Sequence, residues 1–141
     1  KDHVKAQVSP ALISQLDLFA SLVKLTGSEV PEGLDSREHL DALLGKTDKA
    51  REDIVHEAQS KLSYRNGKYA MIPPHKGPKT NITKNELGNS LDWQLYDLET
   101  DRNQQHNIAQ ENPEILEKLK TSFLAIVGDH YNSAVKEVPL K

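Results

Sequence analysis

A short cationic run contains the side chains of this sequence that are best suited to bind a ligand. His75, Lys76 and Lys79 follow one another closely, and no acidic residue occurs from Pro73 through Lys84. Ammonium and imidazolium groups bind anions through charge-assisted hydrogen bonds. The run therefore predicts contact with an anionic ligand, with an ordinary solvated loop as the alternative.

The other polar and charged residues that could do chemistry are interpreted as structural. The sequence has no cysteine, which excludes disulfides, thiolate zinc sites and cysteine nucleophiles within this chain. The five histidines outside the cationic run lack metal-ligand spacing. Asp17, amid apolar residues, is interpreted as a buried polar anchor, with a solvated edge position as the alternative. Asp97 and Asn107 are interpreted as structural, since such side chains bond nearby backbone groups in turns. Residues 49–53 are interpreted as a solvated charge run.

Composition excludes two classes of partner. The 141 residues carry a net charge of -3 with interspersed signs, whereas nucleic-acid binding needs a concentrated basic face. No apolar run approaches the ~20 residues that a helix needs to span a bilayer. The sequence therefore predicts neither a nucleic-acid partner nor a membrane partner.

Helices are predicted near both ends of the sequence. Apolar residues at spacings of three and four predict a helix over residues 9–26, with Ser9 as its cap. Within residues 31–45, Leu40, Leu43 and Leu44 predict a short helix, with Asp35 or Ser36 as its cap and Gly45 as its stop. A last helix is predicted from Asn112 to Gly128, with the Asn112 side chain as cap and Pro113 at its first position.

Strands are predicted in the middle of the sequence. Asn66-Gly67 favours positive φ at both central positions of a two-residue type I′ hairpin turn. Residues 73–92 show no periodicity, and a loop of that length is often functional. We expect an α+β fold, in which a small antiparallel sheet built on a hairpin is packed by the C-terminal helix, with an N-terminal helix, all in one domain over residues 1–141. The predicted strands cover residues 54–59, 61–65, 68–72 and 93–98.

Three stretches occur in an order that is typical of one family. Val8–Gly27 contains a Val-Ser, an Asp-Leu and a Leu-x-x-Leu-x-Gly, and Tyr64–Tyr69 is similar to an Arg-x-Gly-x-x-Lys-Tyr hairpin, one residue shorter. Gln94–Ala109, the most specific stretch, is similar to Glu-Leu-Tyr-Asp-Leu-x-x-Asp-Pro-x-Glu-x-x-Asn-Leu-Ala. With these motifs the chain resembles the C-terminal part of type I sulfatases, the formylglycine-dependent arylsulfatase family.

The resemblance implies a C-terminal fragment of an enzyme that hydrolyses sulfate esters, acting on a sulfated saccharide or an aryl sulfate. It implies an N-terminal catalytic domain as partner, with the nucleophile and a calcium ion upstream of this chain, and a periplasmic or secreted protein. No proline here follows Cys or Ser by two positions, so the nucleophile motif Cys/Ser-x-Pro-x-Arg is absent. We therefore assign no catalytic or metal-binding residue, expect the fragment alone to be inactive, and expect His75, Lys76 or Lys79 to contact the substrate.

Two other readings remain open at this point. The chain could be a stand-alone carbohydrate-binding or protein-interaction module with the same fold, or part of a related phosphodiesterase. The region upstream in the gene discriminates them, because only the enzyme needs the nucleophile motif. A subdomain separated from its partner should also expose an apolar patch. Leu12, Leu16 and Phe19 are the candidates, with self-association as the consequence.

Overall fold

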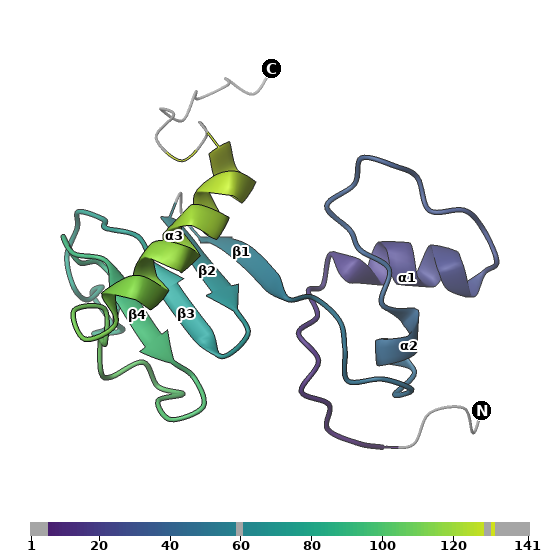
Figure 1. Cartoon of the computed structure of the whole chain (residues 1–141), viewed down its shortest axis with the longest axis horizontal. Helices are drawn as coiled ribbons and strands as arrows, with labels where there is room; N and C mark the ends of the chain where they lie inside the picture. The colour runs from purple at the N-terminus through teal and green to yellow at the C-terminus, as the bar shows by residue number, and fades with distance from the viewer. Residues whose placement is uncertain (1–5, 59–60, 129–130, 132–141) are drawn as a thin grey trace. The chain divides into compact units, whose positions relative to one another are not determined.

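The chain forms two compact units in a computed structural model that describes residues 6–58, 61–128 and 131. Residues 1–54 make up the N-terminal unit, and residues 55–141 make up the C-terminal unit (Figure 1). The expectation of a single domain stays a prediction, because two compact units can form one domain or two.

The N-terminal unit contains two helices, α1 at Asp17–Leu25 and α2 at Leu40–Leu43, joined by irregular segments (Figure 1). The predicted helix over residues 9–26 is therefore too long. A turn precedes α1, because the Asp17 carboxylate accepts the Ser14 N–H over 2.9 Å and the Ser14 carbonyl accepts the Asp17 N–H. Ser9 caps no helix, because α1 begins only at Asp17; its hydroxyl accepts the Ala11 N–H over 3.2 Å and donates to the Asp48 carboxylate over 2.8 Å.

α2 lies where the leucines predicted it, but neither predicted residue caps it. Its N-cap is His39, which makes no capping hydrogen bond with its side chain. The Ser36 hydroxyl instead accepts the Ala20 N–H over 2.9 Å and donates to the Leu16 carbonyl over 2.6 Å. Ser36 thus fastens the segment before α2 to α1.

The C-terminal unit is a four-stranded antiparallel sheet covered on one face by a helix (Figure 1). The strands are neighbours in chain order, so the sheet is a meander. This arrangement confirms the predicted α+β fold with its C-terminal helix on the sheet and its N-terminal helix. The elements are β1 at Asp53–Ala58, β2 at Lys61–Asn66, β3 at Tyr69–Ile72, β4 at Gln94–Asp97 and α3 at Pro113–Val127.

The core of the C-terminal unit lies between the sheet and α3. Tyr64, Met71 and Leu95 stand opposite one another on β2, β3 and β4, and all three are buried. α3 covers this row with buried apolar side chains at helical spacing, and the rings of Tyr64 and Phe123 lie 5.9 Å apart. The buried side chains of α3 are Leu116, Leu119 and Phe123.

The hairpin between β2 and β3 forms at the predicted dipeptide, but the predicted type I′ turn is wrong. Asn66 pairs with Tyr69, so the two central residues are Gly67 and Lys68. Only Gly67 has a positive φ, at 53°, which is the pattern of a type II′ turn. Contacts of Lys68 with the end of β4 favour this register, because its ammonium lies 2.7 Å from the Asp97 carboxylate.

The start of α3 confirms one prediction and corrects another. Pro113 occupies the first turn, where its missing N–H costs nothing. The Asn112 side chain does not cap the helix, because its amide donates to the Ile108 carbonyl over 3.1 Å. The side chain therefore stabilises the preceding turn instead.

Candidate functional site

The loop that carries the cationic run, residues 73–93, leaves β3 and returns to β4. Its two sides bond to each other: the His75 N–H donates to the Ser90 carbonyl over 2.7 Å, and the Leu87 N–H donates to the Lys79 carbonyl over 2.8 Å. An isolated antiparallel bridge joins Thr80 and Glu86. The stretch that lacks periodicity in sequence is thus a narrow, paired projection, which we call the 73–93 loop.

The returning side of the 73–93 loop is anchored on the sheet face opposite α3. Gln94 and Tyr96 alternate with Leu95, so they point away from the core row. The Tyr96 hydroxyl donates to the Gln94 side-chain carbonyl over 2.7 Å, and the Gln94 amide donates to the Gly88 carbonyl over 2.9 Å. Burial raises the pKa of the Tyr96 phenol, which keeps this donor protonated. A rigid strand therefore holds the base of the loop.

Two asparagines shape the loop further, and sequence reasoning missed both roles. Asn89 is 8% exposed, and its amide donates to the Pro78 carbonyl over 2.6 Å. At the tip, the Asn81 side-chain carbonyl accepts the N–H groups of Thr83 and Asn85 and the Thr83 hydroxyl. Asn-x-Thr matches a glycosylation sequence, but the same spacing builds this turn. The Asn-x-Thr spacing could have indicated the turn at Asn81. No local sequence pattern indicated the structural role of Asn89.

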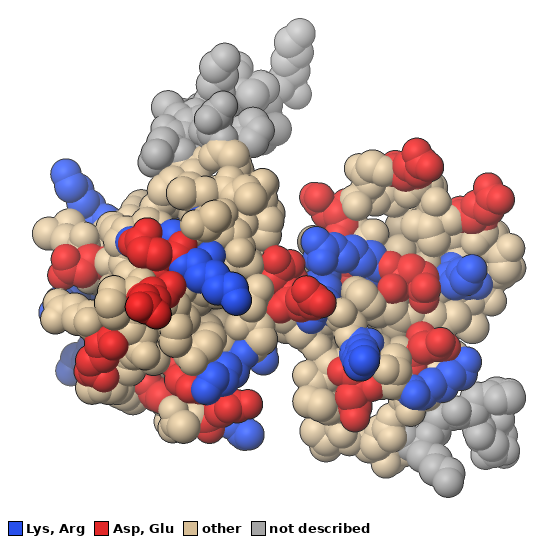
Figure 2. Space-filling view, viewed as in Figure 1, with Lys and Arg blue, Asp and Glu red and all other residues tan. Residues whose placement is uncertain are grey.

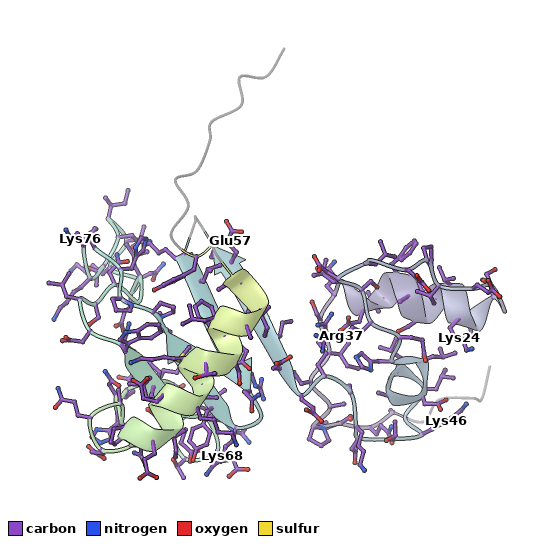
Figure 3. All side chains as sticks on the ribbon, turned by 45° about the horizontal axis from the view of Figure 1, so that its top comes forward. Lys24, Arg37, Lys46, Glu57, Lys68 and Lys76 are labelled. Carbon is purple, nitrogen blue, oxygen red and sulfur yellow. The ribbon has the colours of Figure 1, made fainter. Side chains whose placement is uncertain are left out.

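The three predicted binding residues lie on the outgoing side of this loop. His75 is half-buried, while Lys76 and Lys79 are exposed. Within the described residues, no ion pair involves either lysine. Lys76 lies at the opposite end of β3 from the hairpin turn with Lys68 (Figure 3). The arrangement offers two ammonium groups to an anion, and the binding role stays a prediction.

Asp17 is the anchor of the N-terminal unit, as the sequence predicted. Its fully buried carboxylate accepts a bidentate pair from Arg51, at 2.7 and 2.6 Å, and the Arg37 N–H at 2.9 Å. Burial raises its pKa, but the hydrogen bonds from Arg51, Arg37 and Ser14 outweigh burial and lower it to about 2. This saturated carboxylate holds no proton at neutral pH and performs no acid–base chemistry.

Arg51 therefore does not belong to a solvated charge run. Only 7% of its side chain is exposed, and its guanidinium also donates to the Asp35 carbonyl over 2.6 Å. The interpretation failed because Arg51 is flanked by charges along the chain, while its partner lies 34 positions away. A buried acid at position 17 was the signal that a buried base was needed.

The most specific sequence motif is structural, as predicted for Asp97 and Asn107. The Asn107 side-chain carbonyl accepts the N–H groups of Leu95 and Ala109, which ties the chain after β4 to the strand. The Asp97 carboxylate accepts the Glu99 N–H and pairs with Lys68. Asp101 accepts the Gln105 and His106 N–H groups, and these bonds lower its pKa.

The described part of the chain shows no metal centre and no strongly charged area on its visible face. Among the described residues, no three His, Cys, Asp or Glu side chains are grouped to hold a metal ion. Basic and acidic side chains alternate over the visible face of each unit (Figure 2). No described helix is long and apolar enough to cross a membrane.

Several known proteins are similar to this chain in sequence or in fold. No family model matches it. It is 41% identical over 120 residues to the N-acetylgalactosamine-6-O-sulfatase of Bacteroides thetaiotaomicron, a match that covers 82% of this chain and 24% of that protein. The chain thus spans about a quarter of the length of this curated relative.

Solved structures give a consistent result. A chain described under the metabolism of multiple glycosaminoglycans by Bacteroides thetaiotaomicron is 38% identical and superposes with a TM-score of 0.81, covering 88% of this chain and 27% of that one. A solved 2-O GAG sulfatase is 20% identical with a TM-score of 0.56, covering 87% of this chain and 27% of that one. The second similarity shows the shared fold alone.

Proposed function

Because this chain is the C-terminal subdomain of a sulfatase, we propose that the protein containing it hydrolyses sulfate esters of a sulfated glycosaminoglycan saccharide. The catalytic domain lies outside this chain. The 41% identity to an N-acetylgalactosamine-6-O-sulfatase supports the proposal and makes a saccharide with 6-O-sulfated N-acetylgalactosamine the first substrate to test.

The calcium ion that the resemblance implies does not fit this chain. No described cluster of carboxylates offers the six to eight oxygen ligands that calcium prefers. We assign the ion and the nucleophile to the rest of the protein and derive no step through them here. Export to the periplasm or the medium likewise stays a prediction.

The contribution proposed for this chain is to bind the anionic sugar through the 73–93 loop. The observation that carries it is the pair of exposed ammonium groups of Lys76 and Lys79 on a loop whose base is bonded to β4. A rigid scaffold that positions a loop is the usual design of a binding site. Neither lysine lies in an ion pair with a described residue, so a sulfate group does not have to displace a carboxylate.

Kinetics of the full-length enzyme test this role. Lys76→Ala and Lys79→Ala should each raise KM for the sulfated saccharide by roughly 10- to 100-fold, since a charge-assisted contact contributes ~1.5–3 kcal/mol, and leave kcat unchanged. A small aryl sulfate should show no effect, because it lacks the further sugars that the loop is proposed to bind. Lys118→Ala is the matched control, as it removes an exposed lysine from α3.

Three outcomes would correct the proposal. Wild-type kinetics of both variants on the saccharide would refute the binding role but not the sulfatase activity. Turnover of an aryl phosphate diester, without turnover of the aryl sulfate, would favour a phosphodiesterase. Full-length protein that binds the saccharide but hydrolyses neither ester would favour a carbohydrate-binding module.

A further inference from the structure

The 73–93 loop carries one more residue on its outgoing side than on its returning side. His75 pairs with Ser90 through a hydrogen bond of 2.7 Å, and Lys79 pairs with Leu87 through one of 2.8 Å. Between these two pairs, three outgoing residues stand opposite only two returning residues. An unmatched residue in an antiparallel ladder is the mark of a β-bulge. We call the outgoing residues 76–78 the bulge.

The bulge decides which side chains share a side of the loop. Side chains alternate between the two sides of a strand, so residues three apart in a regular strand point to opposite sides. One extra residue shifts this alternation by one position, which brings Lys76 and Lys79 to the same side. The bridge between Thr80 and Glu86 is the next pair after Lys79, so the Glu86 side chain lies on the other side.

Without the bulge, the same sequence would neutralise one of its lysines. If the pairing of His75 with Ser90 continued regularly along the loop, Lys79 would stand opposite Glu86. Opposite charges in that arrangement interact favourably. Polar strands specify their register weakly, so this alternative pairing is accessible unless a side chain holds the bulge.

Asn89 is the side chain that holds the bulge. Its amide donates to the Pro78 carbonyl over 2.6 Å, and a Cβ added to Gly77 would lie 2.6 Å from the same amide nitrogen. Gly77 also has a φ of 151°, which residues with a side chain rarely adopt. Asn89 is buried, yet its side-chain carbonyl accepts no hydrogen bond from the described residues. A buried amide whose acceptor stays unsatisfied contributes little net stability, so its role is one of geometry.

We infer that Asn89 is a positioning residue for the sugar-binding role proposed above, on which this inference rests. By holding the bulge, it keeps Lys76 and Lys79 on one side of the 73–93 loop and keeps Lys79 away from Glu86. An anionic group of the saccharide then meets both ammonium groups together. Asn89 itself acts through the two lysines and does not bind the sugar.

Kinetics of the full-length enzyme on the sulfated saccharide test this role. Asn89→Leu keeps the approximate size of the side chain but cannot donate to the Pro78 carbonyl. It should raise KM by about tenfold or more and leave kcat, and the kinetics on the small aryl sulfate, unchanged. In an enzyme that already carries Lys76→Ala and Lys79→Ala, it should raise KM no further. Asn103→Leu, at an exposed position between β4 and α3, is the control.

Removing the charge of Glu86 gives a rescue experiment. Glu86→Gln should leave the KM of the wild-type enzyme unchanged but reverse most of the rise caused by Asn89→Leu, because the shifted Lys79 then meets no carboxylate. Deletion of Gly77 removes the extra residue directly, and it should give the same rise in KM and the same reversal. This second variant provides the test if Asn89→Leu does not fold.

The outcomes separate this inference from the proposed function. A wild-type KM of Asn89→Leu and of the Gly77 deletion, beside a raised KM of the lysine variants, would overturn the positioning role alone. A further rise on top of the two lysine substitutions, or a rise that Glu86→Gln does not reverse, would also overturn it. Wild-type kinetics of the lysine variants would instead overturn the binding role on which the inference rests.

Discussion

The two units of this chain differ in the largest side chains that they bury fully, which are apolar or aromatic in the C-terminal unit and polar in the N-terminal unit. The C-terminal unit packs Tyr64, Met71 and Leu95 of the sheet against α3. The N-terminal unit buries Asp17 and Ser21, pairs Asp17 with Arg51, and leaves the large apolar side chains of α1 exposed. A unit with an apolar core can stabilise itself, whereas a unit organised around a buried ion pair gains specific geometry more than stability. The C-terminal unit is therefore expected to depend less on the rest of the protein.

Removing an aromatic side chain from the C-terminal core should have the largest effect. Phe123 is fully buried between Tyr64 and Tyr131, with ring centroids 5.9 and 5.2 Å away. Phe123→Ala should destabilise the C-terminal unit by ~3–5 kcal/mol, because it removes apolar burial and leaves a cavity. Urea unfolding followed by the tryptophan fluorescence of Trp93 measures the loss. Leu124→Ala, at an exposed position on the same helix, is the control.

Breaking the ion pair should have the next largest effect, confined to the N-terminal unit. Arg51→Met leaves the Asp17 carboxylate buried with only two backbone donors, and should cost about 3 kcal/mol, at the lower end for a broken buried pair. NMR signals of Ala20 and Met71 during urea unfolding report the two units separately. Equal destabilisation at both reporters would show that the units unfold together and would break the contrast drawn here.

Acid should weaken the N-terminal unit through the same carboxylate. The pKa of Asp17 is lowered from 3.8 to about 2 in the folded chain, so the unfolded chain binds more protons between these values. The resulting stability of about 2 kcal/mol is present above pH 4 and is lost as pH falls through about 2. Urea midpoints at the Ala20 reporter between pH 5 and 2 measure this slope. Asp17→Asn cannot titrate and should remove it.

A substitution in the hairpin turn should have the smallest effect. Gly67 has a φ of 53° and no atom within 4 Å of an added Cβ, so only backbone strain opposes a side chain. Gly67→Val should cost the C-terminal unit about 1 kcal/mol or more, and Gly67→Asn less, because Asn tolerates positive φ. Unfolding midpoints of the two variants measure the difference. A smaller loss for Val than for Asn would contradict the turn assignment.

Local sequence signals determined where several elements of this protein lie along the chain. Apolar spacing located α3, Asn66-Gly67 located the hairpin, and Pro113 marked the start of the last helix, because each signal acts within a few residues. The motif from Gln94 to Ala109 indicated the family through positions that prove structural. The cationic run located the exposed lysines of the 73–93 loop, but not the bonds that hold the loop.

Tertiary structure alone decided the features that depend on distant partners. Spacing showed that α1 is amphipathic but not which side is buried, since Arg51 attracts the polar side and lies 34 positions from Asp17. The hairpin turn lies one residue later than the Asn66-Gly67 dipeptide predicted, and this register places Lys68 beside Asp97 on β4, a contact that local sequence does not reveal. The 73–93 loop owes its shape to Gln94 and Asn89, whose amides bond carbonyls that no periodic pattern marks. In each case a polar group found its partner across the fold, where hydrogen-bond geometry and not local propensity sets the energy.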